Sequence, residues 1–131
     1  MELVYASDKV RIQCTSVKAA KKLFGGNAEL VKSLFARINA LQMADTIMDI
    51  IVQPTFHFHK LGNMNRKNLE GFFAIDVKSR KAIDVKSRKE QWRVILQPLN
   101  ENKEPFEPCQ IDRISSYVRI VEITEVSKHY E

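Results

Sequence analysis

The chain has 131 residues, which is enough for one domain with a hydrophobic core of its own. Its formal charge of +5 at pH 7 suits a polyanionic partner, although charge alone is weak evidence for one. The two cysteines, Cys14 and Cys109, lack CxxC and zinc spacing, and no apolar run is long enough for a signal peptide or a membrane span. We therefore expect a single cytoplasmic domain, residues 1–131, with reduced thiols.

The N-terminal part of the chain predicts one strand followed by two helices. Met1–Ala6 alternates weakly, as an edge strand does. Ser16 is a suitable N-cap for a helix that Gly25 and Gly26 end, and Asn27 is a suitable N-cap for the next helix. This next helix has an apolar stripe at spacings of three and four residues, formed by Leu30, Val31, Leu34, Phe35, Ile38 and Leu41. The pattern predicts a helical hairpin that packs on a sheet.

The middle of the chain changes from helical to extended patterns. Asp45 or Thr46 is expected to begin a short helical turn that Pro54 ends. Aromatic residues and histidines alternate over Phe56–His59, which predicts a short strand or extended lead-in with both histidines on one face. Gly62–Asn68 is polar and predicts a loop.

An eight-residue duplication lies in a predicted central hairpin. Residues 74–81 (AIDVKSRK) recur letter for letter as residues 82–89. Two apolar runs of period two predict the strands of this hairpin: Phe73, Ile75 and Val77, then Trp92, Val94 and Leu96. Because eight is an even number, either copy can pair with the second strand and bury the same side chains. We expect one copy to project from the sheet, or the long hairpin to be exchanged between two chains as a swapped dimer.

The C-terminal part predicts a loop and a final strand. Pro98–Pro108 holds three of the four prolines and predicts a loop, followed by a short strand at Cys109–Ile111. Tyr117–Glu125 alternates cleanly and predicts the last strand. Helices first and strands afterwards predict an α+β domain in which two N-terminal helices pack on a mainly antiparallel sheet.

The candidate functional groups in the sequence are basic side chains and side chains that can transfer protons. The sequence has no phosphate-binding loop, dinucleotide fingerprint, metalloprotease motif or nucleophile elbow, and His57 and His59 lack an obvious third ligand, so we expect neither metal nor cofactor. Cations that hold phosphates and groups that move protons suit RNA binding, or metal-free cleavage by attack of a ribose 2′-OH on the adjacent phosphate. Each such residue alone is more often a solvated surface charge.

Three segments carry a resemblance to a known family: HKLGNMNRKNLEGFFAIDVKSRK from His59, EQWRVIL from Glu90, and ITEVSKHY from Ile123. Together with the order of the elements, they resemble RelE/HigB-type toxins of bacterial toxin–antitoxin modules, over residues 23–131. The resemblance implies a small α+β fold and a ribosome-dependent mRNA endonuclease that needs no metal and inhibits translation. It also implies neutralisation by a cognate antitoxin, expected to be of helix-turn-helix type, in a toxin–antitoxin hetero-oligomer.

The resemblance also implies roles for individual residues. Arg93 matches a strand arginine that contacts the scissile phosphate, and His59 and Lys60 match a basic pair that serves as base or phosphate contact. The C-terminal Lys-His-Tyr stands where these toxins carry a catalytic cluster, often Asp-Tyr-His. The acidic residue is absent here, and we favour His129 over Tyr130 as the general acid. Four further cations are expected to hold RNA: Arg66, Lys67, Arg88 and Lys128.

Two other functions remain open from the sequence. ParE-like relatives are expected to share the fold and to poison DNA gyrase without cutting RNA, and a duplicated hairpin can leave a protein that binds its antitoxin but no longer cleaves. A stable basic domain that binds RNA without specificity is the third interpretation, and steep salt dependence without cleavage would support it.

Overall fold

The computed structural model describes residues 1–62, 69–78 and 91–128. Within these ranges the strands form one five-stranded sheet of order β1-β5-β4-β3-β2. The first strand is parallel to the last and the other pairs are antiparallel. The strand bounds are Glu2–Tyr5 (β1), His59–Lys60 (β2), Phe73–Asp76 (β3), Trp92–Leu99 (β4) and Ile120–Lys128 (β5). The predicted α+β class and the mainly antiparallel sheet are confirmed, as is an edge strand at the N-terminus.

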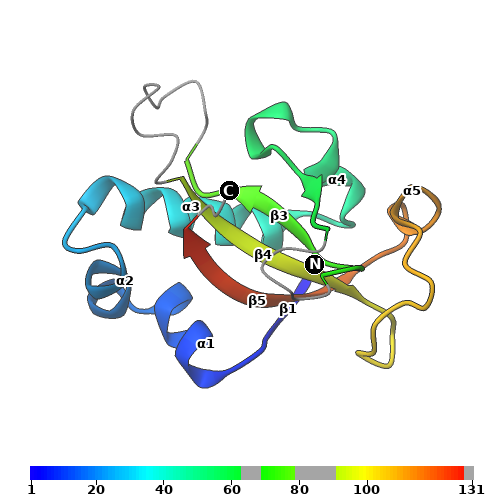
Figure 1. The fold of residues 1–131 in the computed structure, drawn as a ribbon, viewed down its shortest axis with the longest axis horizontal. Coiled ribbons are helices and arrows are strands. Elements are labelled where there is room, and N and C mark those ends of the chain that lie inside the picture. Colours follow the sequence, from blue (N-terminus) through cyan, green and yellow to red (C-terminus); the bar gives the residue numbers. More distant parts are fainter. Residues whose placement is uncertain (63–68, 79–90, 129–131) are drawn as a thin grey trace.

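The helices lie mostly before the sheet in sequence. Their bounds are Asp8–Thr15 (α1), Val17–Leu23 (α2), Ala28–Met43 (α3), Met48–Ile51 (α4) and Ile111–Ile114 (α5), with a 3₁₀ turn at Pro54–Phe56 (η1). The longest, α3, runs behind β3 and β4 in Figure 1. In the described part of the chain, none of these helices has the length and apolar character needed to cross a membrane.

Local capping explains where the first helices begin. The side chains of Ser16 and Asn27 accept hydrogen bonds from the third residue beyond each, at 3.3 and 3.2 Å, so both predicted N-caps are confirmed. The prediction of only two N-terminal helices was wrong, because Ser7 caps an additional helix, α1, in the same way. Ser16 also donates its backbone N–H to Ile12 at the end of α1, so a single residue ends one helix and begins the next.

The main core lies between α3 and one face of the sheet. Four positions of the predicted stripe are buried, and Leu30 and Phe35 pack partly buried at its border. The strands contribute Ile75, Val77, Val94, Leu96, Ile123 and Val126 to the same cluster. A smaller cluster joins the region before α4 to α5 and β5 through Ile47, Ile114, Val118 and Val121. One face of the sheet is therefore packed against α3.

Several predicted bounds were wrong for reasons that involve partners elsewhere in the chain. Pro98 lies inside β4 and not in a loop, and Ile111 begins a helix where a strand was expected. The last strand is shifted toward the C-terminus because β1 pairs with it from Ile120 onward and β4 pairs with it as far as Lys128. Helix α4 begins later than expected because the Asp49 carboxylate accepts the backbone N–H groups of the two residues that were expected to start it.

The first copy of the duplicated segment contributes to β3. Its residues Ala74 and Asp76 pair with Ile95 and Arg93 of β4. The second copy, residues 82–89, lies outside the described residues, as do residues 63–68 of the predicted polar loop. The expected projection or exchange of one copy therefore stays a prediction.

Candidate functional site

The face of the sheet that points away from α3 carries buried polar residues. Residues that pair directly across neighbouring strands share a face. The register of β2 with β3, of β3 with β4 and of β4 with β5 therefore places Gln97, Glu122 and Glu125 on this face, together with four further polar residues: His59, Asp76, Arg93 and Ser127. We call these four residues the polar face.

Two opposite charges of the polar face are buried beside each other. Asp76 is 0% exposed and Arg93 is 7% exposed, and the two residues are direct partners across β3 and β4. A buried charge is costly unless a compensating charge or hydrogen bonds accompany it. The register makes a carboxylate and a guanidinium of opposite charge direct cross-strand partners at the centre of the sheet.

His57 joins this cluster from outside the sheet. It follows the η1 turn and has φ 50° and ψ 51°, so it lies in the left-handed region and not on a strand as predicted. Its Nδ1 lies 3.2 Å from Asp76 Oδ2, a distance that allows an ion pair when the ring is protonated, although the two atoms are not aligned as a hydrogen bond. Its ring stacks on that of His59 with centroids 4.3 Å apart. The two histidines therefore lie together through stacking and not through strand alternation.

One ring nitrogen of His59 is hydrogen-bonded, and the other has no hydrogen-bond partner among the described residues. Its Nδ1 lies 2.7 Å from the carbonyl oxygen of His57, and because a carbonyl only accepts, Nδ1 carries the proton. Its Nε2 is buried and has no hydrogen-bond partner among the residues described. Burial is the largest cause of a lowered pKa of His59, and the charges of His57 and Arg93 lower this pKa further. The hydrogen bond to the His57 carbonyl and the charge of Asp76 act in the opposite direction, and the net pKa is lowered. The ring is therefore unprotonated at Nε2 near neutral pH and can accept a proton there.

Arg37 of α3 connects the helix layer to this cluster. Its Nε donates to the backbone carbonyl of Asp76 at 2.9 Å and its Nη2 donates to that of Thr55 at 3.2 Å. Its guanidinium lies 4.3 Å from the centre of the Phe56 ring. Partial burial lowers the pKa of Arg37, and the charge of Asp76 acts in the opposite direction. The two hydrogen bonds of the guanidinium hold β3 and the η1 turn in a fixed relation.

The structure brings together only some of the residues proposed from the sequence. His59 and Arg93 share the polar face, whereas Lys60 alternates to the other side of β2 and lines a hollow of about 350 Å³ with Phe73. Lys128 pairs with Trp92 and its Nζ lies 5.6 Å from the centre of that ring, so it also lies on the face opposite to Arg93. The other proposed residues lie outside the described residues: Arg66, Lys67, Arg88, His129 and Tyr130.

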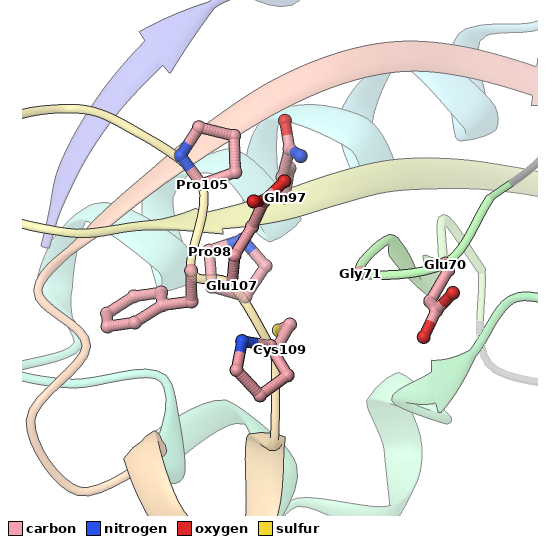
Figure 2. A pocket seen from close by; sticks show the side chains of 9 residues that line it. Glu70, Gly71, Gln97, Pro98, Pro105, Glu107 and Cys109 are labelled. Carbon is pink, nitrogen blue, oxygen red and sulfur yellow. The ribbon is translucent and has the colours of Figure 1, made fainter.

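A hollow of about 370 Å³ lies between the end of β4 and the loop that follows it. In Figure 2, Glu70 lies on one side of this hollow, and Pro98, Pro105 and Glu107 lie on the other. The two carboxylates repel phosphate, and the prolines offer no donor for it. The described lining of this hollow contains no His, Lys or Arg to offset its carboxylates, whereas the polar face contains both a histidine and an arginine. The polar face is therefore the better candidate for chemistry on RNA.

Sequence reasoning missed two members of the cluster, His57 and Asp76. A signal for Asp76 was present, because a single carboxylate interrupts the apolar strand FFAIDV. His57 gave no comparable signal. Its position in the cluster depends on its left-handed backbone conformation and on Asp76 of β3, which follows later in the chain. Among the described residues, no group of three or more His, Cys, Asp or Glu side chains is arranged to hold a metal ion.

Comparison with known proteins adds no further assignment. No protein-family model matches the chain, and no curated protein or solved structure is significantly similar to it.

Proposed function

We propose that this chain is a ribosome-dependent mRNA endonuclease toxin of the RelE/HigB type. It would cleave RNA without a metal, inhibit translation in the cytoplasm and be neutralised by a cognate antitoxin of helix-turn-helix type. One observation carries the proposal: His59, whose buried Nε2 has no hydrogen-bond partner among the described residues, shares a face of the sheet with a buried arginine, Arg93. A base and a fixed cation are the two groups that attack by a 2′-OH requires.

In the proposed reaction, Nε2 of His59 removes the proton from a ribose 2′-OH. The resulting oxygen attacks the neighbouring phosphorus, and the Arg93 guanidinium stabilises the added negative charge. The bond to the 5′-oxygen breaks, and His129, or in its place Tyr130, donates a proton to that leaving group. The products are a 2′,3′-cyclic phosphate and a 5′-hydroxyl, and all atoms are accounted for without water or metal. The cations proposed to hold the RNA around this site are Lys60, Arg66, Lys67, Arg88 and Lys128.

The second candidate is a protein of the same fold that binds gyrase or an antitoxin without cleaving RNA. The charges around the polar face favour it. Glu122 and Glu125 pair with β4 residues on the same face, and with Asp76 they give three carboxylates there against Arg93. The low exposure of Arg93 also suits a structural ion pair. A cleavage assay separates the two candidates.

We would test the proposal by incubating mRNA in a translating extract, with and without ribosomes, with the parent protein and three variants. His59→Gln, Arg93→Ala and His129→Ala should each abolish cleavage, and parent cleavage should require ribosomes. Arg11→Ala is the matched control, because Arg11 forms an exposed ion pair with Asp8 away from the polar face, and it should cleave like the parent.

Failure of the parent to cleave, with thermal unfolding that shows a folded protein, would contradict the proposal. Induction of DNA damage on expression would then favour the gyrase-binding candidate. Loss of cleavage in Arg11→Ala as well would indicate that the variants act through stability and not through the site.

A further inference from the structure

The chain turns into β2 through an unusual backbone conformation at His57. Pro54 opens the η1 turn, and the N–H of His57 donates to the Pro54 carbonyl at 3.1 Å, which closes it. His57 then has a φ of 50°, which turns the chain before β2 begins. Residues with a Cβ adopt this left-handed conformation only against a steric cost, and β-branched residues adopt it least readily.

The turn has a chemical consequence two residues later. It directs the carbonyl oxygen of His57 to the ring of His59, where Nδ1 lies 2.7 Å away. This carbonyl can only accept, so it selects the His59 tautomer that is protonated at Nδ1 and leaves the lone pair on Nε2. The contact depends on the backbone at His57 and not on the identity of its side chain.

We infer that the backbone carbonyl of His57, aimed by the left-handed conformation at that residue, sets the tautomer of His59 and leaves Nε2 as its proton acceptor. His57 is thus a positioning residue that acts through His59. The role of Nε2 as the base in RNA cleavage rests on the proposed function, whereas the choice of tautomer does not.

Three substitutions at one position test this inference: His57→Gly, His57→Ala and His57→Val. All three remove the same imidazole, its stacking on His59 and its contact with Asp76. They differ in how well they tolerate the left-handed conformation, in the order Gly, Ala, Val. A difference among them therefore reports on the backbone carbonyl and not on the lost ring.

The tautomer is read from the ¹⁵N signals of the His59 ring nitrogens in labelled protein, at a pH where the ring is neutral. We expect the parent and His57→Gly to carry the proton on Nδ1, His57→Val to shift toward the Nε2-protonated form, and His57→Ala to lie between them. The inference is overturned if His57→Val keeps the parent tautomer, and equally if His57→Gly loses it as fully as His57→Val does. If His57→Val does not fold, the comparison of Gly with Ala decides in the same way.

Cleavage provides a second readout. Single-turnover cleavage by His57→Val should be about 10- to 100-fold slower than cleavage by His57→Gly, the effect typical of removing a group that orients a functional histidine. The difference should appear in the maximal single-turnover rate and not in the protein concentration that gives half of this rate, because the carbonyl does not touch the RNA. A folded parent that cleaves no RNA would overturn the proposed function, and the ¹⁵N comparison would still decide the inference.

Discussion

His59 differs from an ordinary surface histidine because partial burial and three neighbours act on its ring. Burial and the charges of His57 and Arg93 disfavour its protonated form and together lower its pKa, whereas the hydrogen bond to the His57 carbonyl and the charge of Asp76 favour that form. In the unfolded chain these influences are absent and the pKa returns to an ordinary value of about 6.5. The folded protein therefore takes up a proton at His59 less readily than the unfolded chain does.

This difference predicts how stability depends on pH. Because the pKa of His59 is lowered on folding, its stabilising contribution is complete above about pH 6.5 and is lost as the pH falls through the folded value. The free energy of unfolding should thus decrease on acidification, and it should decrease less in His59→Gln than in the parent. Urea unfolding at several pH values between about 5 and 8 measures both. Equal pH dependence in the two proteins would contradict the prediction.

At the scale of elements, α3 depends on its N-cap. The Asn27 side chain accepts from the backbone N–H of Leu30 at 3.2 Å, and Glu29 lies in the first turn, where a carboxylate suits the helix dipole. Asn27→Ala should lower the free energy of unfolding by about 1 kcal/mol, and Asn27→Gly by only a few tenths. Urea unfolding checks this, and an alanine variant as stable as the parent would show that the cap contributes nothing measurable.

Arg37 links α3 to β3 and to the η1 turn through hydrogen bonds to two backbone carbonyls. Arg37→Met keeps an unbranched apolar side chain over Phe56 but leaves the carbonyls of Asp76 and Thr55 without this donor. We expect a loss of about 1–3 kcal/mol in the free energy of unfolding.

Arg11→Met is the control for this loss. The side chain of Arg11 forms an exposed ion pair with Asp8, and the substitution should change stability by less than about 0.5 kcal/mol. Similar losses in both variants would indicate that Arg37 has no special linking role.

At the scale of the whole molecule, the duplication can be removed without a change of register. Deletion of residues 82–89 leaves one AIDVKSRK between the same flanking residues and roughly halves the connection between Asp76 and Trp92. Halving a loop lowers its closure entropy cost by about 0.6 kcal/mol, so the variant should be slightly more stable than the parent. Circular dichroism and urea unfolding measure this. A destabilised variant would mean that the second copy contributes contacts of its own.

The same deletion also tests chain exchange. If the long hairpin is swapped between two chains, the parent should sediment as a dimer and the shortened variant as a monomer. An identical mass for both would exclude the duplication as the cause of any association.

The sequence by itself determined the features that depend on neighbours in the chain. Ser16 and Asn27 were recognisable as caps because a cap bonds to a backbone N–H only three residues away. The apolar stripe of α3 and the alternation in β3 and β4 were readable because each period reports which side of an element is buried. The α+β class follows from the order of these elements.

Only the tertiary structure decided the features that depend on distant partners. The bounds of β5 follow from pairing with a strand at the other end of the chain, and α1 has too weak an apolar pattern to be found without its contacts. Asp76 and Arg93 become a buried pair through the register of two strands, and His57 enters their cluster through one left-handed residue. The strand register and the left-handed turn bring together residues that are not related by any sequence periodicity. The candidate site could therefore be predicted from the sequence only in part.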